Sequence, residues 1–127
     1  MTSSTSVLSP AIPQLPSGDL QLTAEFYRER LGFTQFKMYS EHGHLIAKRE
    51  QVEVHFWHAG SETEARKYGS ASSCYIRVQN IVPLYEELKA RGAPFGYELT
   101  IQSWGMHEMQ VDDPYGNAIR FGEEIKA

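Results

Sequence analysis

The sequence has little cysteine, little basic charge and no long hydrophobic run, and each shortage excludes a class of protein. Its single cysteine, Cys74, excludes a disulfide within the chain and favours a reducing compartment, the cytoplasm. Lysine and arginine number 12 against 16 aspartate and glutamate residues, and the net charge of −4 argues against nucleic acid, which requires a basic surface. No apolar run approaches a membrane span. We therefore expect a cytoplasmic protein that binds neither nucleic acid nor membranes, and whose acidic balance favours cationic ligands.

The hydrophobic content of 41% is enough for a buried core in one domain. The first residues are rich in serine and threonine and lack the basic start and long apolar core of a signal peptide. We expect a flexible tail over residues 1–10 and a single domain over residues 11–127.

Two segments have the apolar spacing of an amphipathic helix. The first follows Asp19, a favourable N-cap, and ends at Gly32, which is suited to the left-handed conformation after a helix. The second follows Asn80, which we expect to cap it, and ends at Gly92. The expected buried faces are Leu20, Ala24, Tyr27 and Leu31 in the first helix and Ile81, Leu84 and Leu88 in the second.

Strand-like segments surround the two helices in the same order. Each helix is preceded by one short apolar segment and followed by three segments in which apolar and polar residues alternate. The pattern predicts an α+β fold of two βαβββ repeats, about 11–60 and 72–125, that form an incomplete barrel with a concave cavity. The expected strands cover residues 11–15, 34–40, 44–49 and 52–58 in the first repeat, and 74–78, 95–99, 106–112 and 118–122 in the second.

The strand faces that point away from the helices combine aromatic and polar residues. A face that only met water would hold mostly Lys, Glu and Thr, whereas this mixture is typical of a concave binding surface. A solvated outer face is the alternative. The residues concerned are Glu53, His55, Trp57, Tyr75, Arg77, Glu108, Gln110 and Arg120.

The segments "GDLQLTAEFYRERLGF", "RVQNIVPLYEELKARG" and "DPYGNAIRF" together resemble the glyoxalase, bleomycin-resistance and extradiol dioxygenase superfamily, also called vicinal oxygen chelate proteins. The resemblance implies that enzymes of this kind hold a divalent metal on the first and last strands of each repeat. By spacing, these positions are Ile12, His55, Ser73 and Arg120 here. Only His55 is a good ligand for a transition metal, and Arg120 would repel the ion. We therefore expect no metal, no other cofactor and no enzymatic activity.

A chain that has this fold but lacks the metal ligands resembles the bleomycin-resistance subgroup in particular. That resemblance implies antibiotic resistance by a homodimer, which sequesters the drug in crevices at the subunit interface and exchanges an N-terminal strand. The stretch "QSWGMHEMQVDDPYGNAIRF" carries Trp104, the residue expected to stack on the flat part of the drug, and "AIPQLPSGDL" is similar to the exchanged arm. A second aromatic partner falls near His44 or Tyr39.

Charged residues of the expected cavity allow two readings. Glu53 and Glu108 are the candidates that would meet a cationic tail of the ligand. Arg77 and Arg120 either form ion pairs with these carboxylates or bind an anionic group of the ligand. Trp104 itself is either a ligand contact or an ordinary packing residue at the edge of a dimer.

Two other functions stay open on the sequence. One is a metal-dependent lyase, isomerase or dioxygenase of the same superfamily, which requires His42, His44 or His107 to reach the cavity. The other is a binding module for a different small metabolite.

Overall fold

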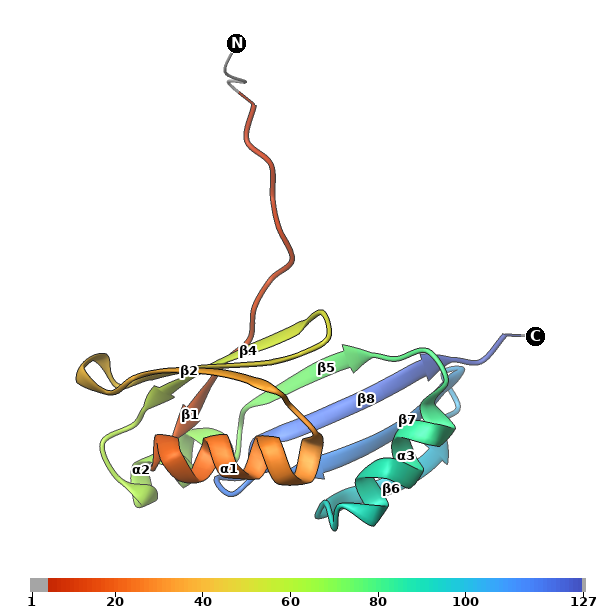
Figure 1. Ribbon diagram of the computed structural model, residues 1–127. Helices are drawn as coiled ribbons and strands as arrows, with labels where there is room; N and C mark the ends of the chain where they lie inside the picture. The colour runs from red at the N-terminus through yellow and green to blue at the C-terminus, as the bar shows by residue number, and fades with distance from the viewer. Residues whose placement is uncertain (1–4, 127) are drawn as a thin grey trace.

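The computed structural model describes residues 5–126 and contains the two predicted βαβββ repeats, joined by a further helix (Figure 1). The first repeat consists of β1 (Gln14–Ser17), α1 (Leu20–Leu31), β2 (Gln35–Tyr39), the 3-10 turn η1 (Ser40–His42), β3 (His44–Arg49) and β4 (Val52–His58). The helix α2 (Glu62–Gly69) follows. The second repeat consists of β5 (Ser73–Arg77), α3 (Ile81–Ala90), β6 (Phe95–Ile101), β7 (Met106–Asp112) and β8 (Ala118–Glu124).

Each repeat forms its own four-stranded sheet with the same topology. The strand orders are β1-β4-β3-β2 and β5-β8-β7-β6, with the first strand of each repeat parallel to the last and the other pairs antiparallel. Both sheets are open. The helices α1 and α3 lie on the same side of the molecule, with α1 beneath the first sheet in the view of Figure 1, and the sheet faces turned away from these two helices are the open faces. The predicted repeat and fold class are confirmed.

The helix ends show which local predictions were right. Asp19 caps α1 by accepting a hydrogen bond from the Leu22 amide at 3.0 Å, and Gly32 adopts the left-handed conformation with φ of 70°. Asn80 precedes α3 as expected, but its side chain makes no capping bond. The carboxylate of Glu123 accepts hydrogen bonds from the Asn80 and Ile81 amides at 2.7 and 3.1 Å and takes that role. Because Glu123 lies on β8, far from α3 in the sequence, no residue next to the helix indicates this cap.

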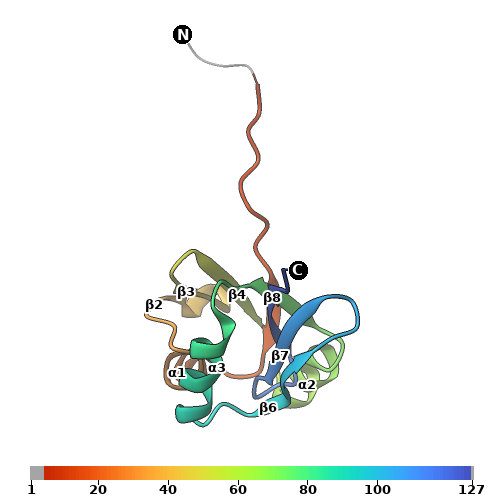
Figure 2. The same cartoon turned by 90° about the vertical axis from the view of Figure 1, so that its right-hand side faces the viewer.

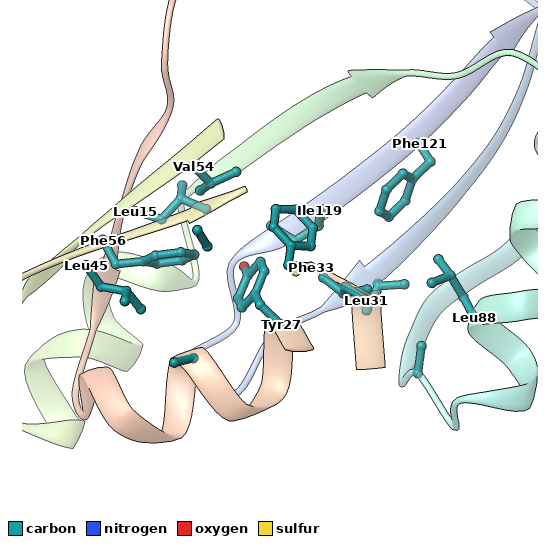
Figure 3. Close-up of a cluster of buried hydrophobic side chains, with 14 of the residues drawn as sticks. Leu15, Tyr27, Leu31, Phe33, Leu45, Val54, Phe56, Leu88, Ile119 and Phe121 are labelled. Atoms are coloured by element: carbon teal, nitrogen blue, oxygen red, sulfur yellow. The ribbon is translucent and has the colours of Figure 1, made fainter. Parts of the chain in front are cut away.

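The core lies between the helices and the sheets and draws on both repeats (Figure 3). Tyr27 of α1 is fully buried, and its ring packs edge-on against Phe33 and Phe56. The alternation predicted for β4 is confirmed, since Val54 and Phe56 are completely buried on the helix side. Side chains of β7, β8 and α3 complete the cluster, among them Leu88, Met109, Val111, Ile119 and Phe121.

Residues 5–13 run away from the folded body (Figures 1 and 2). Val7 and Leu8 in this arm are 88% and 94% exposed. The ordered strand begins at Gln14, later than the predicted 11–15, and pairs at the edge of the sheet with β4 of its own chain. The first four residues of the expected tail and the last residue, Ala127, lie outside the described residues. No helix among residues 5–126 is long and apolar enough to cross a membrane.

Candidate functional site

The predicted ligand-binding residues fall into two groups, one on the open face of each sheet. Those of the first sheet form what we name the β4 cluster: Tyr39, His44, Glu53, His55 and Trp57. The second sheet holds a cavity of about 420 Å³, which we name the Glu108 pocket, lined by Tyr75, Tyr97, Gln102, Trp104, Glu108 and Arg120. Among the described residues, no hydrogen bond or ring contact joins the two groups.

Glu108 of β7 lines the Glu108 pocket and is only 4% exposed. One of its oxygens accepts hydrogen bonds from Tyr75 Oη at 2.5 Å and Trp104 Nε1 at 3.4 Å. The other accepts a bond from Tyr97 Oη at 3.4 Å. Burial, together with the neighbouring carboxylate, raises the pKa of Tyr75 to about 12 and also raises the pKa of Tyr97. Both tyrosines therefore keep their protons and act as donors.

A glycine on β8 allows Tyr75 to reach this carboxylate. Gly122 pairs with Glu108 in the β7–β8 register, and a Cβ placed on Gly122 would lie 1.9 Å from Tyr75 Oη. The missing side chain leaves the space through which the tyrosine crosses β8.

Trp104 stands in the β6–β7 turn and is 65% exposed, as expected for a ring in a loop. Gly105 beside it has φ of 83°, a conformation that glycine adopts without strain. One edge of the indole is held by Glu108, and most of the ring is accessible to a ligand.

Ion pairs of Arg77 and Arg120 with Glu53 or Glu108, one of the two readings of the sequence, do not form within residues 5–126. Arg120 donates instead to Gln110 Oε1 at 2.9 Å, and both arginines are exposed. The hydrogen-bond donors of Glu108 are aromatic side chains, and Glu53 lies on the other sheet. Because both guanidinium groups are accessible to water, neither needs a buried counter-ion.

The β4 cluster is organised around His55. Its Nδ1 lies 3.2 Å from His44 Nε2, and its Nε2 lies 2.5 Å from Glu53 Oε2. The hydrogen bond to His55 lowers the pKa of Glu53, and Lys48, whose Nζ is 3.6 Å from the other Glu53 oxygen, acts in the same direction. Tyr39 lies beside His44, with ring centroids 6.3 Å apart. Further along the face, Trp57 packs on Tyr68 of α2, with ring centroids 5.7 Å apart.

The donor set does not fit a divalent metal. Both ring nitrogens of His55 are already in hydrogen bonds that point in different directions. The strand register corrects the positions deduced from spacing, because Gln14 and Tyr75, rather than Ile12 and Ser73, lie beside His55 and Arg120. Between residues 5 and 126, no three His, Cys, Asp or Glu side chains are arranged to hold a metal ion. This statement includes His42, His44 and His107, on which a metal-dependent enzyme would depend.

Sequence reasoning missed Tyr97, Gln102 and Tyr68. Strict alternation would place Tyr97 on the same face as Phe95, which packs against the core. An irregularity in the β6–β7 register pairs Phe95 with Val111 but Tyr97 with Gln110, and so turns Tyr97 to the open face. Tyr68 lies on α2, which was not predicted, although Ser61 and Glu64 provide a capping signal before it.

Comparison with known proteins gives a consistent result. Residues 10–121 match the model of the "Glyoxalase/Bleomycin resistance protein/Dioxygenase superfamily". The chain is 31% identical over 131 residues to a bleomycin resistance protein of Geobacillus stearothermophilus, covering 92% of this chain and 98% of that protein. It is 30% identical over 118 residues to one of Klebsiella pneumoniae, covering 87% of this chain and 88% of that protein.

Among solved structures, a bleomycin-binding protein complexed with bleomycin superimposes with a TM-score of 0.75 at 28% identity, covering 92% of this chain and 99% of that one. A bleomycin resistance determinant encoded on the transposon Tn5 superimposes with a TM-score of 0.75 at 26% identity, covering 92% of this chain and 98% of that one. The matches extend over both repeats and both sheets. The chain therefore belongs to the glyoxalase/bleomycin resistance protein/dioxygenase superfamily.

Proposed function

We propose that this chain is a binding protein that sequesters bleomycin-type antibiotics, flat molecules with a cationic tail, without changing them chemically. The observation that carries the proposal is the exposed Trp104 ring, which lines a pocket together with other aromatic side chains. The similarity to bleomycin resistance proteins over nearly the full length of both chains supports the same function.

The exposed indole can hold a flat heteroaromatic group. Offset stacking on an aromatic ring contributes roughly 0.5–1.5 kcal/mol beyond the burial of surface. Trp104 is held at one edge by Glu108, so little freedom is lost when a ligand stacks on its face. Tyr75 and Tyr97 extend the apolar wall beside it.

The two open faces fit a homodimer. In a single chain the β4 cluster and the Glu108 pocket lie on separate sheets, and each is open to one side. In our proposal the β4 cluster of one subunit faces the Glu108 pocket of the other, so that a ligand lies between Trp104 and the Tyr39–His44 pair. Residues 5–13, with Val7 and Leu8 exposed, are then the arm that crosses to the partner, while β1 keeps its place beside β4. Sedimentation that gives only a 14.4 kDa particle would contradict this part.

In the part of the chain that the structure describes, no set of side chains fits a metal ion, which supports binding without catalysis, in keeping with the names of the similar proteins. The single, free Cys74 suits a cytoplasmic protein.

Calorimetric titration with copper-bleomycin tests the proposal. We expect saturable binding in the micromolar range or tighter, and a loss of about tenfold or more in Trp104→Ala. Leu22→Ala is the matched control, because it removes an exposed apolar side chain from α1, on the helix side of the molecule. The absence of saturable heat from the unaltered protein would refute bleomycin as the ligand.

A further inference from the structure

The carboxylate of Glu108 is buried without a cationic partner. It forms no ion pair within residues 5–126, and its hydrogen-bond donors are the neutral groups of Tyr75, Tyr97 and Trp104. Neutral donors compensate only part of the cost of removing a carboxylate from water. The side chain nevertheless lines an open cavity, so a cation that entered could reach it.

The walls around this carboxylate are of the kind that attracts organic cations. Tyr75, Tyr97 and Trp104 line the same cavity, and no two of these rings stack on each other in the described chain. Aromatic faces attract ammonium and guanidinium groups through their quadrupole, and tryptophan does so most strongly. A hydrated metal ion gains little from such walls, whereas an alkylated cation gains contact with both the rings and the carboxylate.

Two positive groups lie near the cavity and act against a cation. Arg120 lines it but is exposed, with Nε bound to Gln110. Arg77 is exposed on β5, two residues after Tyr75. Both guanidinium groups are in contact with water, which weakens their field, although Arg77 and Arg120 still lower the pKa of Tyr75 and Tyr97 in part. Glu108 is the one buried charge among the lining residues, and it is screened much less.

We propose that the Glu108 pocket is a subsite for an organic cation, such as a quaternary ammonium, sulfonium or guanidinium head group. The inference deepens the proposed function and rests on it for the natural guest, whose cationic tail would occupy this subsite. A volume of about 420 Å³ is ample for such a head group.

The pair choline and 3,3-dimethyl-1-butanol tests the charge requirement on the unaltered protein. The two molecules have the same shape, and the alcohol has carbon in place of the charged nitrogen. Binding is followed through the indole N–H resonance of Trp104, which is bonded to Glu108, at constant ionic strength. An inert chemical-shift standard added to the sample is the reference. We expect choline to shift the Trp104 resonance saturably, with an affinity at least about tenfold higher than that of the alcohol.

Glu108→Gln tests the role of the carboxylate, since glutamine keeps the shape and removes the charge. Glu98→Gln is the matched control, because this carboxylate bonds Tyr85 on the exposed surface and does not line the pocket. We expect choline affinity to fall by about tenfold or more in Glu108→Gln and by less than about twofold in Glu98→Gln. If Glu108→Gln fails to fold, the comparison of choline with the alcohol still decides the question.

The inference is overturned if the alcohol binds as well as choline, if choline leaves the Trp104 resonance unchanged, or if folded Glu108→Gln binds choline unchanged. Titrating the same variants with bleomycin separates this result from the proposed function. Bleomycin binding without choline binding leaves the proposed function in place and removes the cation subsite. Choline binding without bleomycin binding supports the cation subsite and refutes the proposed function.

Discussion

Replacing Tyr27 by phenylalanine tests how the two repeats are held together. Tyr27 lies on α1 of the first repeat, and its hydroxyl donates a 2.9 Å hydrogen bond to Asp113 Oδ2 in the β7–β8 turn of the second. Asp113 also accepts bonds from the Tyr115 amide at 2.9 Å, the Asn117 amide at 3.0 Å and Asn117 Nδ2 at 2.8 Å. The substitution therefore removes one of the four donors that satisfy a buried carboxylate.

The magnitude follows from the burial of this hydrogen bond. Phenylalanine fills the same space as Tyr27, so no cavity opens, and the loss is that of one bond to a charged acceptor. We expect the free energy of unfolding to fall by about 1–2 kcal/mol, which lowers Tm by about 4–8 °C in a chain of this size.

The effect should depend on pH. Burial raises the pKa of Asp113, while hydrogen bonds from Asn117, Tyr115 and Tyr27 lower it in part. The folded state thus holds this proton more readily than the unfolded state, and stability from this group is lost as the pH rises through the raised pKa. Without the Tyr27 hydroxyl the pKa of Asp113 rises further. The destabilisation should therefore be larger at pH 7 than at an acidic pH below the raised pKa of Asp113, where the carboxyl holds a proton in the folded state.

Urea denaturation followed by circular dichroism at both pH values measures the loss. Tyr85→Phe is the matched control, since this hydroxyl bonds an exposed carboxylate, that of Glu98, and its removal should change stability little. A loss in Tyr27→Phe no larger than the control, or one equal at both pH values, would refute this reasoning.

Three further outcomes are expected from the contacts between and within the repeats. Glu87→Gln should lower stability by about 0.5–1 kcal/mol at pH 7, because Glu87 binds the Arg49 guanidinium at 2.8 and 2.9 Å. That bond lowers the pKa of Glu87, so the ion pair stabilises the fold at pH values above the ordinary pKa of a glutamate. The stabilisation is lost as the pH falls through the lowered pKa of Glu87, and the urea midpoints of variant and parent should therefore converge in acid. Glu123→Gln should speed hydrogen exchange of the first amides of α3, seen by NMR. Gly122→Ala should displace Tyr75 and lower its pKa from about 12 towards 10.0, measured from its ring carbon resonances.

Local patterns in the sequence were sufficient to predict the two repeats but not α2, the helix that joins them. Asp19, Gly32 and the alternation in β4 act on their own neighbourhood, so they could be recognised before the fold was known. The helix α2 buries only Ala65 and Gly69, so it lacks the apolar stripe by which the other two helices were predicted.

The site depends on contacts that local patterns do not encode. The β6–β7 irregularity that turns Tyr97 towards Glu108 arises from the pairing of two strands. The contact between His44 and His55 likewise depends on the β3–β4 register. The alternation in each strand predicted which face carries the polar and aromatic residues, but not that they divide between two sheets.

The mass and amount of drug recovered from the complex test non-catalytic sequestration most directly. Protein is saturated with bleomycin, separated from free drug, incubated for increasing times and then denatured, and the released drug is measured by mass spectrometry. We predict one molecule of unaltered bleomycin per subunit at every time. Released drug of altered mass, in an amount that grows with time, would contradict the account.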